Sequence, residues 1–136
     1  MKIAQYGTTI AVIHAIANGL HGLAHLKIPI PLSLLQSLFV GIVIFLIPII
    51  AAVLLWTQFY RIGIWLLLSS IAGSFLFGFY NHFIAISPDH VSQVAFEGWG
   101  WLFQVTAILI LIVDGLGTGI GLWALRTIQQ KEQGAL

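Results

Sequence analysis

Four long apolar stretches constrain what this chain can fold into. They cover about residues 3–26, 33–57, 62–86 and 99–125, and each has the roughly 20 apolar residues that a helix needs to cross a bilayer. Helix is the expected state of each stretch, because lone strands in lipid would leave their backbone polar groups unpaired. The sequence therefore predicts an all-α integral membrane protein, a four-transmembrane-helix bundle in which residues 1–136 form one transmembrane domain.

The low share of charged residues supports this class. Only 7% of the 136 residues are charged and 60% are hydrophobic, whereas a soluble domain has about 25% charged residues. The net charge of +1 gives no indication of nucleic-acid binding, so the expected partners are the lipid bilayer and either further copies of the chain or a larger membrane complex. The absence of cysteine excludes thiolate ligands, disulfides and cysteine nucleophiles.

The basic residues predict an orientation. Four of them share one side of a four-span topology, whereas Lys27 lies alone on the other, so both termini are expected on the cytoplasmic side (N-in/C-in). The four are Lys2, Arg61, Arg126 and Lys131. The first stretch, at about 24 residues, exceeds the roughly 7–15 of a signal-peptide core, so we expect a retained span. The expected location is a bacterial inner membrane or a thylakoid-type membrane.

Polar side chains in the first stretch gather on one narrow stripe. At about 100° per residue, and with His14 at zero, Asn18 falls near about 40°, His21 near about −20° and His25 near about 20°. A lipid-facing helix would not gather its polar groups in this way. We therefore expect the stripe to face other helices and to build a site there.

Three histidines predict a metal site in the outer half of the bundle. His21 and His25 are spaced i, i+4, which places both imidazoles on one side of a helix, and His82 from the third stretch lies at a matching depth. Three nitrogens with an open position would suit zinc, copper or iron. The loop before the fourth stretch offers a further ligand, or a group that orients the imidazoles, in Asp89, His90 or Glu97. Ordinary turn chemistry after Pro88 also explains Asp89.

A b-type haem is the alternative cofactor. It requires one histidine from each of two facing helices, which His82 together with His21 or His25 would supply. The macrocycle also needs room, and Gly19, Gly22 and Gly78 stand close to these histidines. The i, i+4 spacing favours a metal ion and the glycines favour a tetrapyrrole, so both interpretations stay open.

A second pair of ionisable residues lies near mid-membrane. His14 and Asp114 have similar predicted depths, and an ionisable side chain there usually faces the bundle interior and finds a partner. We predict that they lie near each other, either as a proton relay or cofactor contact or as a buried pair that fixes helix register. Asn18 is a cofactor contact or an interhelical hydrogen-bonding group.

Glycines in the fourth stretch allow close helix contacts. The pairs Gly115/Gly119 and Gly117/Gly121 let a neighbouring backbone approach. Packing within the bundle and homodimerisation are both open for this seam.

Three functions follow from these patterns. The first is a membrane protein whose histidine cluster binds a metal ion or haem near the non-cytoplasmic face, for redox chemistry or metal handling. The second is an accessory subunit of a respiratory or photosynthetic complex without a cofactor of its own, and the third is a proton or ion channel that uses His14 and Asp114. The chain has no nucleophile elbow, phosphate-binding loop or dinucleotide fingerprint, so the sequence assigns no enzyme activity.

Overall fold

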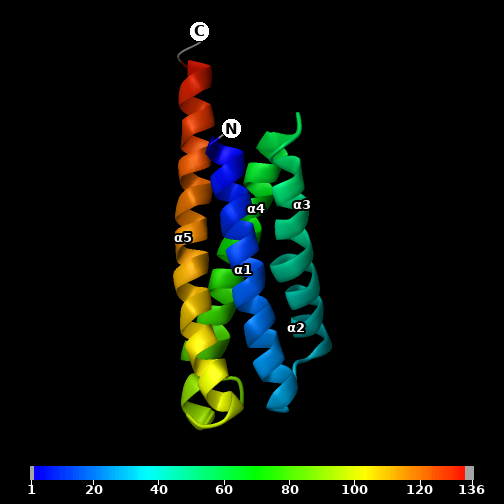
Figure 1. Cartoon of the computed structure of the whole chain (residues 1–136), viewed down its shortest axis with the longest axis vertical. Helices are drawn as coiled ribbons and strands as arrows, with labels where there is room; N and C mark the ends of the chain where they lie inside the picture. The colour runs from blue at the N-terminus through cyan, green and yellow to red at the C-terminus, as the bar shows by residue number, and fades with distance from the viewer. Residues whose placement is uncertain (1, 134–136) are drawn as a thin grey trace.

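The computed structural model describes residues 2–133, apart from the side chains at 131 and 132. The prediction that Lys131 lies on the cytoplasmic side therefore concerns a side chain outside the described residues. Within the described range the chain is helical, with no strand, and its long helices run side by side as a bundle (Figure 1). The elements are α1 (Lys2–Lys27), α2 (Leu34–Phe39), η1 (Val40–Leu46), α3 (Ile47–Leu54), α4 (Tyr60–Phe79), η2 (Tyr80–Ile84), η3 (Val91–Gln93) and α5 (Trp99–Gln133).

Four helical segments are long and apolar enough to cross a membrane. They are Lys2–Lys27, Leu34–Leu54, Tyr60–Ile84 and Trp99–Gln130. The prediction of an all-helical chain with four such helices is confirmed. The fourth helix extends beyond the predicted end at 125, because the residues that follow are largely Arg, Gln, Lys and Glu, which are strong helix formers. Helix α1 begins and α5 ends at the same end of the bundle (Figure 1).

Two of the helical segments contain π-helical turns. Segment η1 is π-helical and ends just before Pro48, whose ring cannot donate a backbone hydrogen bond. Segment η2 is a second π-helical turn at the end of α4, and it carries His82. Such turns change the direction in which side chains leave a helix, and they are frequent at functional sites.

Small residues bring α5 close to α4 and α1. A Cβ added at Gly121 would come 3.0 Å from the Leu68 Cβ, and one at Gly117 would come 2.9 Å from Ile71 Cγ2. Gly119 is exposed, and a Cβ added there would meet nothing within 4 Å. The Gly117/Gly121 pair therefore serves packing within the bundle, whereas the other predicted pair faces outward.

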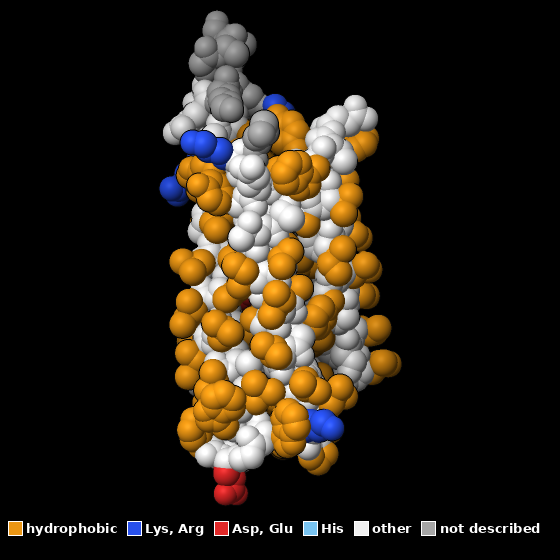
Figure 2. Space-filling model, in the orientation of Figure 1, with side chains coloured by type: hydrophobic (Ala, Val, Ile, Leu, Met, Phe, Trp, Pro, Cys, Tyr) orange, Lys and Arg blue, Asp and Glu red, His pale blue; other side chains and the backbone are white. Residues whose placement is uncertain are grey.

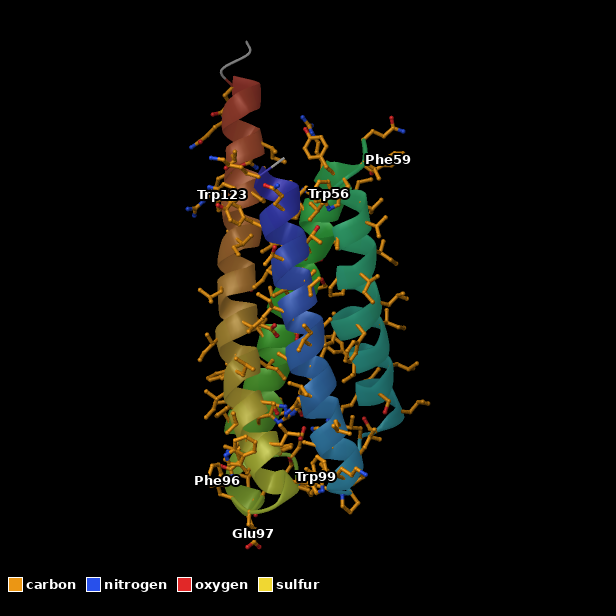
Figure 3. The ribbon with its side chains drawn as sticks, in the orientation of Figure 1. Trp56, Phe59, Phe96, Glu97, Trp99 and Trp123 are labelled. Atoms are coloured by element: carbon orange, nitrogen blue, oxygen red, sulfur yellow. The ribbon has the colours of Figure 1, made fainter. Side chains whose placement is uncertain are left out.

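The outer surface of the bundle is apolar along its sides. Figure 2 shows hydrophobic side chains covering the length of the visible face, with Lys, Arg, Asp and Glu confined mainly to the two ends. Trp56 and Trp123 lie at one end and Trp99 at the other (Figure 3). This distribution matches the aromatic belts that flank the apolar part of membrane proteins.

Candidate functional site

His21, His25 and His82 come together between α1 and η2. One ligand nitrogen from each ring lies within 4.8 Å of the other two, a group that could hold a metal ion. His21 and His82 are buried, and His25 is half-buried. The i, i+4 spacing on α1 supplies the first two rings, and the π-helical turn η2 brings the third from the facing helix.

The neighbours of His21 determine which of its ring nitrogens carries the proton and which has a lone pair. Its Nδ1 lies 2.9 Å from Thr106 Oγ1. The Thr106 hydroxyl donates to the Leu102 carbonyl at 2.5 Å, so towards His21 it can only accept. His21 therefore carries its proton on Nδ1, and its Nε2 holds a lone pair.

The same reasoning applies to His82. Its Nδ1 lies 3.0 Å from the backbone carbonyl oxygen of Asp89, which can only accept a hydrogen bond. His82 therefore donates from Nδ1 and leaves a lone pair on Nε2. That Nε2 lies 3.1 Å from the Nε2 of His21. Two lone pairs so close repel each other unless a proton or a metal ion lies between them.

The third ring, His25, lies beside the carboxylate of Asp89. Its Nε2 lies 3.2 Å from Asp89 Oδ1, and its Nδ1 is buried without a hydrogen-bond partner among the described residues. An ionised carboxylate makes Nε2 the protonated nitrogen, so Nδ1 is the lone-pair atom. In metal sites the second nitrogen of a histidine ligand is usually tied in this way to a carboxylate, carbonyl or other acceptor.

Asp89 connects two of the three rings. Its Oδ1 lies 3.2 Å from His25 Nε2 and 3.3 Å from His82 Nδ1. Burial by itself would raise the pKa of Asp89, but the N–H groups that His25 and His82 turn towards the carboxylate outweigh it and hold that pKa well below its usual value. The carboxylate is therefore ionised and provides a fixed negative charge beside the cluster.

An apolar shell and a cavity surround the cluster. The fully buried ring of Phe103 contacts all three imidazoles, with centroid distances of 4.8, 5.2 and 5.5 Å to His21, His25 and His82. On another side lies a cavity of about 190 Å³, which all three histidines line. An ion held by the three rings could thus have protein on one side and an open space on the other.

His14 and Asp114 form a separate, fully buried pair. His14 Nδ1 lies 2.6 Å from Asp114 Oδ1, and both side chains are 0% exposed. The predicted proximity of the two residues is confirmed. Asn18 Nδ2 donates to the His14 carbonyl at 3.0 Å, and the same atom lies 3.2 Å from His14 Nδ1.

The other His14 nitrogen contacts the backbone of a third helical segment. His14 Nε2 donates to the Ile44 carbonyl at 2.8 Å. Pro48, four residues after Ile44, has no N–H to give to this carbonyl, so the oxygen is available to a side chain. His14 thus ties α1 to both α5 and η1.

Two predicted ligands lie apart from the cluster. His90 caps the short helix η3, where its Nδ1 accepts from the Ser92 backbone N–H at 3.1 Å. Glu97 is exposed and extends away from the bundle at its end (Figure 3). Neither belongs to the group of His21, His25 and His82, because the loop folds so that Asp89 turns inward instead.

Sequence reasoning gave too little weight to Asp89 and missed Thr106 and Phe103. From the sequence, Asp89 was only one of three loop residues that could bind the metal or orient the imidazoles. Thr106 is one of three threonines on α5, a pattern that gives no signal, and Phe103 is one of nine phenylalanines in the chain.

The fold and the site define a class: a four-helix bundle of membrane-spanning length with a largely buried histidine cluster that could hold a metal ion. Comparison with family models, with curated proteins and with solved structures found no significant match. The function is therefore argued from the site alone.

Proposed function

We propose that this chain is an integral membrane metalloprotein in which His21, His25 and His82 bind one transition metal ion. The observation that carries the proposal is the 3.1 Å approach of His21 Nε2 to His82 Nε2, each with its other nitrogen facing an acceptor. A tetrahedral ion with metal–nitrogen bonds of about 2.0–2.1 Å separates its ligand nitrogens by about 3.3–3.4 Å. The two nitrogens are thus close to the spacing that a single ion requires.

The geometry favours an ion over a b-type haem. In a haem with two histidine ligands, the ligating nitrogens stand on opposite faces of the macrocycle, about 4 Å apart, with the ring between them. The His21 and His82 rings are in direct contact, with centroids 4.7 Å apart, and Phe103 packs against both. The neighbouring cavity of about 190 Å³ is also smaller than the roughly 300–1,000 Å³ typical of pockets for larger ligands.

Three neutral nitrogens favour zinc, copper or iron over calcium or magnesium, which prefer oxygen ligands. A site with three protein ligands and an open position is typical of metal centres that perform chemistry, whereas structural sites are closed by a fourth protein ligand. We therefore favour redox chemistry or metal handling over a purely structural role. Asp89 would orient two of the ligands and offset part of the charge of the ion.

Membrane insertion is part of the proposal. Its supports are the four apolar helices, the charged residues at the bundle ends and the tryptophans near both ends (Figures 2 and 3). With both termini on the cytoplasmic side, the histidine cluster lies near the non-cytoplasmic face. Cysteine-accessibility labelling of single cysteines introduced at Gln133 and at Glu97 in intact cells tests this orientation, because only the second position should react with an impermeant reagent.

Elemental analysis together with an absorption spectrum tests the metal centre. The protein, purified in a mild detergent after a brief metal loading and desalting, should retain about one transition metal ion per chain and show no Soret band. His21→Ala should lose the ion. His90→Ala is the matched control, because it removes a histidine outside the cluster, and it should retain the ion.

Three results would contradict the proposal. Equal metal content in both variants would place the ion elsewhere, and a metal-free wild-type chain that co-purifies with other membrane subunits would favour the accessory-subunit alternative. A Soret band that is present in the wild type and absent in His21→Ala would show that the histidines bind haem and not a metal ion.

A further inference from the structure

The cavity beside the histidine cluster has features of a binding pocket. It has a volume of about 190 Å³ and reaches from the three histidines and Asp89 to Asn18 and Ile44, both of which contact the buried His14. An engineered cavity of about 150 Å³ in another protein is large enough to hold benzene. The space is therefore sufficient for a molecule of about six to ten non-hydrogen atoms.

Ser74 supplies an independent observation. It lines this cavity and is only 1% exposed, and its hydroxyl has no hydrogen-bond partner among the described residues. A buried hydroxyl without a partner is unfavourable, because it has lost its hydrogen bonds to water and gained none within the protein. A ligand that bonds to this hydroxyl would remove that penalty.

The walls of the cavity indicate an uncharged ligand. Asp89 is the one acidic side chain among the lining residues, and it already faces His25 and His82. Much of the remaining wall is apolar, including Leu26, Val40, Phe45 and Phe77. A charged molecule would lose its hydration here without gaining a partner on these walls.

We infer that the cavity binds a small neutral molecule, which coordinates the open position of the metal ion through one lone-pair atom and bonds to the Ser74 hydroxyl. This inference rests on the proposed function, because the ion holds one end of the ligand. The molecule is a substrate or co-ligand of compact size, with mostly apolar surface.

Gly22 allows the cavity to be filled without replacing a metal ligand. Asn18, Gly22 and His25 follow one another on a single face of α1 and all three line the cavity. A Cβ added at Gly22 would meet nothing within 4 Å, so a leucine side chain has room to extend along the wall. Gly19 is the matched control, because it lies on the same helix, also has open space at its Cβ, and does not line the cavity.

The experiment uses the cobalt(II)-loaded protein in detergent, because the visible spectrum of cobalt reports its coordination. Imidazole at a pH where it is neutral is the probe, with phenylimidazole as a larger neutral probe and azide as an anion. Imidazole should change the spectrum and bind more tightly than either of the others. Gly22→Leu should weaken imidazole binding at least about tenfold with cobalt affinity unchanged, Gly19→Leu should leave both unchanged, and Ser74→Ala should weaken imidazole binding about threefold or more.

The outcomes separate the two proposals. If the wild-type protein takes up no cobalt, the proposal of a metal centre is wrong, and this inference is wrong as well. If cobalt binds but imidazole binding is the same in Gly22→Leu and wild type, or azide binds as tightly as imidazole, the metal centre stands and the inference of a neutral-ligand pocket is overturned.

Discussion

The buried pair of His14 and Asp114 offers a test of how much one interaction stabilises the bundle. Alanine replaces His14, Asp114 or both, and the free energy of unfolding is measured for the four proteins in mixed micelles. This double-mutant cycle isolates the interaction between the two side chains from the separate effects of each substitution. Both side chains are fully buried and their atoms are 2.6 Å apart, so the pair has little competition from water.

The magnitude follows from two references. Side-chain hydrogen bonds between helices of membrane proteins contribute about 0.6 kcal/mol on average and about 1.7 kcal/mol at most. Charge-assisted hydrogen bonds are roughly twice as strong as neutral ones. We therefore expect a coupling energy of at least about 1.2 kcal/mol.

The single substitutions should differ from each other. His14→Ala should destabilise the bundle by about 1 kcal/mol more than Asp114→Ala, because His14 also donates to the Ile44 carbonyl. A coupling energy at or below about 0.6 kcal/mol would refute the reasoning, since the pair would then be no stronger than an ordinary interhelical hydrogen bond. Equal effects of the two single substitutions would refute the role given to the Ile44 contact.

Three further predictions concern the groups around the cluster and the glycine seam. Thr106→Val removes the acceptor for His21 Nδ1, and it should weaken metal affinity by about 10- to 100-fold in a chelator competition titration, with the helical circular dichroism unchanged. Asp89→Asn should weaken metal affinity by a similar factor in the same titration, because the negative charge beside His25 and His82 is lost; affinity equal to wild type would show that this charge does not contribute to metal binding. Gly117→Leu should lower the thermal midpoint of the bundle by forcing α5 away from α4, whereas Gly119→Leu should leave it within the error of the scan; equal midpoints would contradict the assignment of Gly117 to the interior.

The sequence was sufficient to predict the helices and the inward face of α1. Bilayer-length apolar runs leave helix as the one state that satisfies the backbone, so the four helices followed from composition and length. The i, i+4 spacing of His21 and His25 places both rings on the same side of α1. The similar predicted depths of His14 and Asp114 in the membrane were enough to predict that they pair. These predictions succeed because helix geometry is regular and translates spacing into position.

The supporting groups of the cluster could not be predicted in the same way. The path of a loop is not fixed by any periodicity, so His90 and Glu97 were preferred as candidate ligands over Asp89, which ordinary turn chemistry also explained. The structure turns Asp89 inward and leaves His90 to cap η3. Thr106 was hidden for another reason: a hydroxyl on an apolar helix normally bonds to the carbonyl one turn before it, and that bond is present here as well.

One signal in the sequence was stronger than it first appeared. A proline within a helix, such as Pro48, frees a carbonyl about one turn before it, and a carbonyl freed within an apolar bundle needs a donor from elsewhere. His14 provides that donor to Ile44. His14 and the cluster are connected along α1 by Asn18, which contacts His14 and lines the cavity that the three histidines share. The polar stripe of α1 therefore serves two sites with one cavity between them, which is why a single narrow face carries three histidines and an asparagine.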